Sequence, residues 1–273
     1  MSARARFSTG GSLTEAGDRP DLYSEVQGEG EPVLMIAGVA SDTISWQLQV
    51  AGLRERYQLV LFDNQGVGRS PVPDHPITIE QMAWDALRVL DRHQVERAHI
   101  VAHSMGTAIA QTLARLHPDR VNKMVLAAPF PHLSALGKLA VESWVMGLRE
   151  KVSQELFGRS LFPWLFTDRF LAQDGVFDLC LDGFKSHPYP LTAEGLQRQW
   201  EALRSFDSIS WLPQVTAPTL LLAGSQDILT PPVQAETMQR LLPNAELRLL
   251  DAGHSALVEQ AEDFNQAVTN FLN

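Results

Sequence analysis

The sequence predicts a doubly wound α/β fold, in which helices cover both faces of a mostly parallel, twisted sheet. Two features of the chain carry this prediction. Short apolar runs alternate with longer segments whose apolar residues recur at helical spacing, and Gly or Pro marks many of the boundaries. A continuous apolar run suits a strand that is buried on both faces, because helices cover both sides of a parallel sheet.

Six apolar runs are the predicted strands. The first, 32–37 (PVLMIA), is closed by Gly38. The second, 58–62 (QLVLF), is followed by the polar stretch 63–66 (DNQG). The other four predicted strands are 98–102 (AHIVA), the apolar part of 121–128, 219–223 (TLLLA) and 247–250 (LRLL).

Four amphipathic segments between and after these runs are the predicted helices. Residues 79–93 place apolar side chains on one helix face, and residues 105–116 are rich in alanine and stop before Pro118. Prolines at 231 and 232 suit the first turn of a helix that runs to about residue 242. A terminal helix is predicted over 256–271.

Residues 130–211 break the alternation, because they contain helix-like segments and no convincing buried strand. We therefore expect a core domain made of 1–129 and 212–273, with 130–211 as a helical cap. This insertion holds many of the aromatic residues, and binding pockets are lined mainly by apolar and aromatic groups. Trp164 and Trp200 are the candidates for substrate binding, and the alternative is that they pack in the cap's own core.

The overall charge argues against two classes of partner. The chain has 273 residues with 22 basic and 32 acidic side chains, a net charge of −10. Nucleic acids and anionic membranes both favour basic surfaces, so neither is an expected partner. We expect a small-molecule ligand and a monomer or homodimer.

The chain is expected to be cytoplasmic. Its single cysteine, Cys180, permits no intramolecular disulfide, which fits a reducing compartment. No apolar run approaches the ~18 residues that a membrane span needs. The basic N-terminal stretch 1–7 is followed by Gly and Ser rather than by an apolar segment, so it does not read as a signal peptide.

A serine occupies the turn between the predicted strand 98–102 and the helix that begins at Met105. A nucleophilic serine at such a turn sits in a strained conformation, and small residues two positions before and after it relieve crowding. Ala102 and Gly106 flank Ser104 in this way, although glycine is the usual residue at both positions. Ser104 is therefore the candidate nucleophile.

With the turns 224–227 (GSQD) and 251–254 (DAGH) that follow the last two strands, the chain resembles the α/β-hydrolase fold family. The shared features are the order Ser104, Asp227, His254 and the loop 62–70 (FDNQGVGRS), in which Gln65 replaces a usual arginine. The resemblance runs from about residue 23 to the C-terminus. In its loop and length the chain is similar to small carboxylesterases and 3-oxoadipate enol-lactonases.

This resemblance implies a catalytic triad. Ser104 would be the nucleophile, His254 the base that takes its proton, and Asp227 the acid that orients the imidazole. Asp251, three residues before His254, is a competing acid that we interpret as structural, and Asp207 is a weaker competitor.

The resemblance also implies an oxyanion hole made of two backbone N–H groups. Met105 follows the nucleophile and supplies one, and Val39, in the loop after the first strand, supplies the other. Gly38 permits that turn and is expected to contact substrate. Ala37 stands where family members often have histidine. His103, next to Ser104, is expected to pack away from the nucleophile.

The leading hypothesis is hydrolysis of a small carboxylic ester or lactone through an acyl-enzyme. A serine nucleophile disfavours the dehalogenases and epoxide hydrolases of this fold, which use aspartate. Hydrolysis of a carbon–carbon bond, a perhydrolase side activity and a role as a triad-containing small-ligand receptor or signalling protein stay open. No metal-ligand spacing and no phosphate loop are present, so no metal and no cofactor are expected.

Overall fold

The computed structural model describes residues 21–273, so the N-terminal stretch 1–7 lies outside the described residues. The described chain forms one seven-stranded sheet in the order β1-β3-β2-β4-β5-β6-β7. Its strands are β1 (Ser24–Gln27), β2 (Glu31–Ile36), β3 (Tyr57–Phe62), β4 (Ala98–His103), β5 (Val121–Ala127), β6 (Thr219–Gly224) and β7 (Ala245–Leu250).

All six predicted strands are present, within two residues at each end, and they pair in parallel. The seventh strand, β1, was not predicted and pairs antiparallel with β3. Its sequence, SEVQ, has a single apolar residue and no run that marks a buried strand. At the opposite edge, β7 is partly exposed rather than buried on both faces, because only β6 pairs with it.

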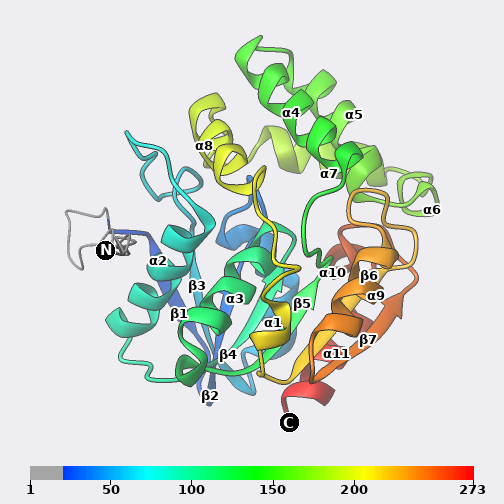
Figure 1. Ribbon diagram of the computed structural model, residues 1–273. Helices are drawn as coiled ribbons and strands as arrows, with labels where there is room; N and C mark the ends of the chain where they lie inside the picture. The colour runs from blue at the N-terminus through cyan, green and yellow to red at the C-terminus, as the bar shows by residue number, and fades with distance from the viewer. Residues whose placement is uncertain (1–20) are drawn as a thin grey trace, which may run out of the picture.

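Alternate residues of the central strands pack on opposite faces of the sheet. Leu34 and Ile36 of β2 belong to one apolar cluster, whereas Val33 and Met35 belong to the other. Helices α2 (Ile79–Arg92), α3 (Met105–Leu116) and α9 (Pro232–Leu241) contribute to the first cluster, and α1 (Gln47–Leu53) and α11 (Ala261–Leu272) contribute to the second (Figure 1). This layering confirms the doubly wound α/β arrangement.

The predicted terminal helix is wrong as one element. It is divided into α10 (Ala256–Glu259) and α11, and Gln260 between them has φ −132° and ψ 48°, outside the helical region. The break has a local cause in side-chain bonding. The Glu259 carboxylate accepts the Gly253 N–H at 2.8 Å, and Gln260 donates to the Asp251 carbonyl oxygen at 3.3 Å. Both bonds tie this corner back to the turn before His254.

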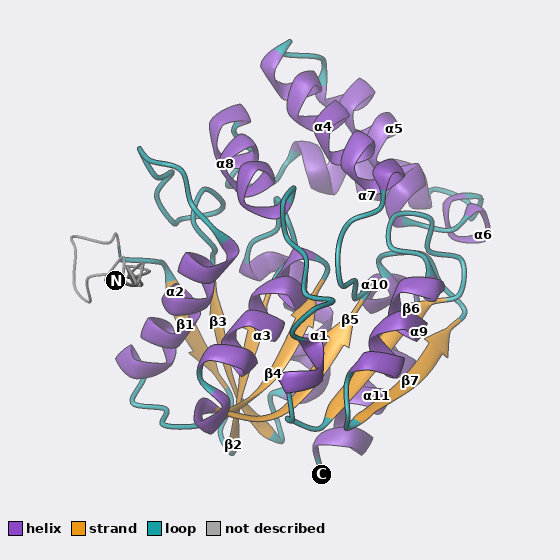
Figure 2. Cartoon of the chain, viewed as in Figure 1, coloured by secondary structure: helices purple, strands orange, loops and turns teal. Residues whose placement is uncertain are grey.

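Five helices lie between β5 and β6 and form a separate layer at one end of the sheet (Figure 2). Their inner side chains, among them Trp144 and Phe157, join the larger apolar cluster. We call helices α4–α8 the cap: α4 (Ala135–Arg149), α5 (Gln154–Leu165), α6 (Asp168–Leu171), α7 (Val176–Lys185) and α8 (Ala193–Leu203).

Three short 3-10 helices complete the fold: η1 (Thr43–Trp46), η2 (Pro118–Arg120) and η3 (Leu212–Gln214). Across residues 21–273, no helix combines the length and apolar character that crossing a membrane requires.

Candidate active site

Ser104 stands in a strained turn between β4 and α3. Its φ of 52° lies in the left-handed region that non-glycine residues rarely adopt. Gly106 allows this turn, because a Cβ there would lie 2.2 Å from the Ile36 carbonyl oxygen and 2.8 Å from that of Ala37. The start of α3 therefore packs directly on the end of β2. Ala102 is fully buried in the sheet core, so its methyl group fits where glycine is usual.

A continuous hydrogen-bond chain joins the three residues singled out in the sequence. His254 Nε2 lies 2.9 Å from Ser104 Oγ, and His254 Nδ1 lies 2.9 Å from Asp227 Oδ2. These residues come from three turns at the carboxyl ends of β4, β6 and β7, which parallel strands bring to one edge of the sheet. They are shielded from water, with relative exposures of 7% for Ser104 and 3% for both His254 and Asp227.

Asp227 is held as a carboxylate. Its Oδ1 accepts the backbone N–H groups of Leu229 at 2.8 Å and Thr230 at 2.9 Å. The Thr230 hydroxyl donates to Asp227 Oδ2 at 2.8 Å. Burial alone would raise the pKa of Asp227, but the charge and hydrogen bond of His254 and the bonds from Thr230 outweigh it and lower that pKa. Asp227 can therefore accept a hydrogen bond from Nδ1–H and stabilise an imidazolium.

Neither competing acid contacts the imidazole of His254. Asp251 is exposed and pairs with Arg169 of α6, Oδ2 to Nη1 at 2.6 Å, and with the Gln226 amide at 2.7 Å. Asp207 accepts the Ile209 N–H at 2.9 Å and forms an isolated bridge with His132. The geometry thus favours Asp227 as the partner of His254.

His103 does not contact the Ser104 hydroxyl and bonds instead to the backbone of the histidine turn. Its Nε2 lies 3.1 Å from the His254 carbonyl oxygen. A carbonyl oxygen only accepts, so Nε2 carries the proton. Burial, reinforced by the nearby His254, lowers the pKa of His103 to about 3, which keeps the ring neutral.

The proposed oxyanion donors flank Ser104. A Cβ built on Gly38 would lie 3.2 Å from Ser104 Cβ and 3.3 Å from His103 Nδ1, so the Gly38 backbone passes next to the serine. Within residues 21–273, neither the Val39 N–H nor the Met105 N–H donates a hydrogen bond to protein. Both N–H groups can therefore donate hydrogen bonds to a ligand bound at Ser104.

The two tryptophans proposed to bind substrate differ in burial. Trp200 of α8 is 5% exposed and packs in the larger apolar cluster, whereas Trp164 of α5 is half-buried at the edge of that cluster. Trp164 borders Leu165, whose carbonyl oxygen accepts the Ser255 N–H at 2.8 Å, next to His254. Contact of either tryptophan with a substrate remains a prediction.

Two positioning residues were missed by the sequence reasoning. The Thr230 hydroxyl lies 3.2 Å from His254 Nδ1 and 3.2 Å from the Ala128 carbonyl oxygen, besides its bond to Asp227. Glu259 binds the Gly253 N–H and, through the same carboxylate, the backbone and hydroxyl of Thr167 in the cap. Their only signal is a polar residue three after Asp227 and one five after His254, which many ordinary turns share.

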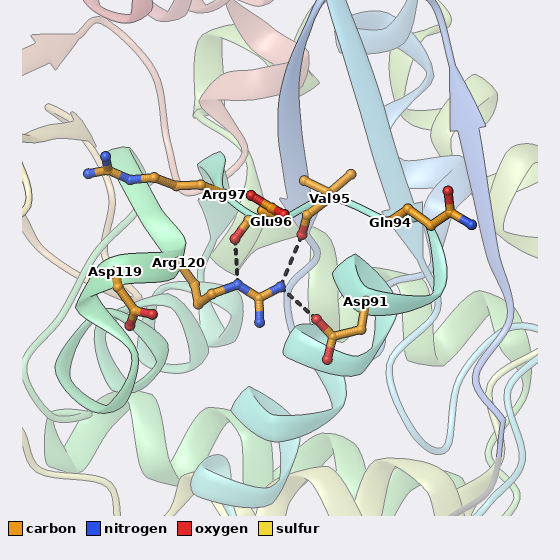
Figure 3. A pocket seen from close by; sticks show the side chains of 7 residues that line it. All are labelled: Asp91, Gln94, Val95, Glu96, Arg97, Asp119 and Arg120. Carbon is orange, nitrogen blue, oxygen red and sulfur yellow. Dashed lines mark hydrogen bonds and ion pairs between the residues drawn. The ribbon is translucent and has the colours of Figure 1, made fainter.

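One cavity lies away from Ser104. It has a volume of about 620 Å³ and opens between the end of α2 and the starts of β4 and β5, the opposite ends of the strands from the serine turn (Figure 3). Arg120 spans it, donating to Asp91 at 2.6 Å and to the Val95 carbonyl oxygen at 3.0 Å. The Arg120 guanidinium in this cavity is already paired with the Asp91 carboxylate and with backbone carbonyl oxygens. In the part of the chain that the structure describes, no three His, Cys, Asp or Glu side chains cluster as a metal site.

Comparison with known proteins places these features in a family context. A family model described as the alpha/beta hydrolase fold matches residues 31–261. A protein of Azorhizobium caulinodans named as a carbamate hydrolase, RutD, is 30% identical over 261 residues, which cover 93% of this chain and 96% of the relative.

Solved structures agree in fold. The enol-lactonase from Burkholderia xenovorans LB400 aligns with a TM-score of 0.83 at 25% identity, covering 92% of this chain and 96% of that one. A thermophilic esterase from Thermogutta terrifontis aligns with a TM-score of 0.79 at 28% identity, covering 92% of both chains.

Proposed function

Because this chain belongs to the α/β-hydrolase fold family, we propose that it is a serine hydrolase that cleaves a small carboxylic ester or lactone through an acyl-enzyme. The observation that carries the proposal is the hydrogen-bond chain from Ser104 Oγ through the His254 ring to Asp227 Oδ2, at 2.9 Å for each contact. Each of the three side chains has a separate task in acyl transfer.

Acylation begins when Ser104 Oγ attacks the carbonyl carbon and His254 Nε2 takes the hydroxyl proton. The resulting oxyanion is stabilised by the N–H groups of Val39 and Met105 and by the N-terminus of α3. Collapse expels the alkoxide, to which His254 returns the proton. In a lactone the leaving alcohol stays attached to the acyl group.

Deacylation repeats these steps with water. His254 Nε2 takes a proton from the water molecule that attacks the acyl carbonyl, and the proton then goes to Ser104 Oγ as the acid leaves. Asp227 keeps Nδ1 protonated and offsets the positive charge of the imidazolium in both halves. The lowered pKa of Asp227 supports this role, since a carboxylate is needed at neutral pH.

The names of the relatives guide the choice of substrate. An enol-lactonase and an esterase share the fold with at least 25% identity, which supports an ester or lactone. A carbamate is the second candidate, because the relative at 30% identity over 93% of this chain is named as a carbamate hydrolase. A carbamate carbonyl accepts the same serine attack. A cytoplasmic location and a monomeric or homodimeric state stay predictions.

The proposal is tested with a panel of p-nitrophenyl acetate, p-nitrophenyl butyrate, small lactones and a p-nitrophenyl carbamate. We expect steady multiple turnover of at least one ester or lactone by the wild type and none above background by Ser104→Ala. Turnover confined to the carbamate would favour the second candidate. A single slow acylation without turnover of any compound would favour a receptor.

A further inference from the structure

The side chain of Gln199 links the cap to two loops of the core. Gln199 lies in α8 and is fully buried. Its Oε1 accepts the Ala40 N–H at 2.8 Å, and its Nε2 donates to the Gln65 carbonyl oxygen at 2.8 Å. Ala40 belongs to the loop after β2, and Gln65 belongs to the loop after β3. One amide therefore joins three segments that are far apart in the sequence.

Both contacts match the chemistry of a carboxamide in one orientation only. The oxygen faces an N–H donor, and the NH₂ group faces a carbonyl acceptor. If the amide were rotated by 180°, its NH₂ group would face the Ala40 N–H and its oxygen would face the Gln65 carbonyl oxygen, so neither hydrogen bond could form. Among the natural side chains of this size, only glutamine supplies both an acceptor and a donor without charge.

The contact on Ala40 bears directly on the neighbouring oxyanion donor. Ala40 has a φ of 60°, a conformation that alanine does not favour. The Val39–Ala40 peptide is held at both ends, because Val39 O accepts the Ser41 hydroxyl at 3.3 Å while Ala40 N–H donates to Gln199. Among the described residues, the next amide back along the chain, Val39 N–H, has no protein acceptor, and the adjoining Gly38 backbone passes close to Ser104.

Helix α8 packs closely against the core of the protein through its backbone. Gly195, one turn before Gln199, packs against Gly66, since a Cβ on Gly195 would lie 2.0 Å from the Gly66 carbonyl oxygen. Thr192 caps the helix by accepting the Gly195 N–H at 3.0 Å. The Gly195–Gly66 contact sets the distance between α8 and the core, and the Gln199 side chain bonds from α8 to the loop after β2, which contains Val39 and Ala40.

We propose that Gln199 is a positioning residue that holds the Val39 N–H in the geometry needed to bind the oxyanion, and so couples seating of the cap to catalysis. This inference rests on the proposed function, in which Val39 is an oxyanion donor. Without the Gln199 amide, the Val39–Ala40 peptide is free to leave its strained conformation, and the Val39 donor moves away from the developing charge.

The test compares Gln199→Met with Gln197→Met. Both glutamines lie on α8, but within residues 21–273 the hydrogen bond of the Gln197 amide goes to the Glu201 carboxylate, on the same helix. Thermal melts establish that both variants fold. For Gln199→Met we expect kcat on p-nitrophenyl acetate to fall by about tenfold to a hundredfold with KM changed by less than about threefold. Removal of one oxyanion donor costs about a hundredfold to a thousandfold in kcat, and this variant displaces the donor without removing it. Gln197→Met retains the wild-type kcat.

A second variant, Gln199→Glu, adds a readout that a purely structural role would not move. An ionised carboxylate keeps the acceptor for Ala40 but turns a second acceptor toward the Gln65 carbonyl oxygen, and protonation supplies the missing donor. The ratio of kcat in Gln199→Glu to kcat in the wild type should therefore rise as the pH falls. Charged groups near this contact include Asp85, bonded to the Gln65 amide, Arg88 beside it, and Arg198, which precedes residue 199 on α8 and pairs with Glu194 and Glu201; all are common to the two proteins.

Hydrogen exchange separates this inference from the proposed function. In Gln199→Met, the peptide spanning residues 37–42 should exchange faster than in the wild type and in Gln197→Met. Unchanged exchange there, or an unchanged kcat in a folded Gln199→Met, would overturn the inference. A wild type that turns over no ester, lactone or carbamate would defeat the proposed function instead, and faster exchange would still show that Gln199 holds the loop.

Discussion

His103 Nε2 donates a hydrogen bond to the carbonyl oxygen of His254 across 3.1 Å. The residue before the candidate nucleophile thus holds the backbone of the candidate base. The two rings lie 5.0 Å apart between centroids. A proton on both rings would bring two positive charges together, so His103 serves this position best as a neutral donor.

Protonation of His103 is expected to destabilise the fold in acid. The unfolded histidine binds a proton near its ordinary pKa of 6.5, whereas the folded one does so only at about 3. Protons therefore favour the unfolded state between these values, and stability falls as the pH drops. Urea unfolding at several pH values should show the wild type losing up to about 1.4 kcal/mol per pH unit more than His103→Gln below pH 6.5.

The control for His103→Gln is His75→Gln, at an exposed histidine whose hydrogen bond, in the part of the chain that the structure describes, is to the adjacent Asp74. This variant should follow the pH dependence of the wild type. Parallel curves for wild type and His103→Gln from pH 7 to pH 4 would contradict the interpretation of His103 as a neutral, half-buried donor.

Replacing Asp227 should impair catalysis far more than replacing Asp251. Asp227→Asn removes the charge beside His254 Nδ1 and allows the wrong imidazole tautomer, so we expect kcat to fall by about 10⁴-fold. Asp251→Asn alters an exposed ion pair with Arg169, which solvent screens, so kcat should stay near the wild-type value. Steady-state kinetics on p-nitrophenyl acetate measures both, and a larger loss in Asp251→Asn would mean that Asp227 is not the triad acid.

A methyl group at position 106 should disrupt the serine turn. The added Cβ of Gly106→Ala would meet the backbone oxygens of Ile36 and Ala37, neither of which can rotate away. We expect a loss of about 1–3 kcal/mol in the free energy of unfolding, as for other overpacked sites, together with a large loss of activity.

Gly183→Ala is the matched control, because Gly183 lies within α7 and, among the described residues, a Cβ there would meet no atom within 4 Å beyond its chain neighbours and its own helix backbone. That variant should gain about 0.5–1 kcal/mol from the better helix propensity of alanine. Chemical denaturation compares the two, and a Gly106→Ala protein as stable and active as the wild type would refute the close packing of α3 on β2.

The aromatic residues of the cap are expected to set substrate size. Half-buried Trp164 lies on α5, which leads into the segment that bonds to the histidine turn, so Trp164→Ala should widen the preference for longer acyl chains. Trp200→Ala removes a side chain from the apolar cluster and should also lower the melting temperature. Activity profiles from p-nitrophenyl acetate to octanoate measure the preference, and unchanged profiles in both variants would show that other residues line the pocket.

The central strands and the serine turn could be predicted because their signals are local. Continuous apolar runs mark β2 to β6, and the small residues around Ser104 follow from crowding within one turn. The edge strand β1 carries one apolar residue and is defined by pairing with β3, so its sequence alone does not reveal it. The break at Gln260 goes with two bonds of Glu259, a local one to Gly253 and one to Thr167, which is distant in the sequence.

The residues of the candidate site also differ in whether a local sequence pattern indicates them. Ser104, Asp227 and His254 stand in turns whose order along the chain is informative, and the structure brings them within hydrogen-bond distance. Thr230 and Gln199 are recognisable only once the loops are folded together. Gln199 in particular lies in the insertion, and nothing in its local sequence distinguishes it from Gln197, two residues earlier on the same helix.

The most direct test of the central claim is to look for the acyl-enzyme itself. Wild-type protein mixed rapidly with p-nitrophenyl acetate and quenched in acid within the first turnover should gain the mass of one acetyl group, and peptide mapping should place that group on Ser104. Ser104→Ala should acquire none. Steady turnover of the ester with no acetyl group on Ser104, or with the same rate in Ser104→Ala, would contradict the account.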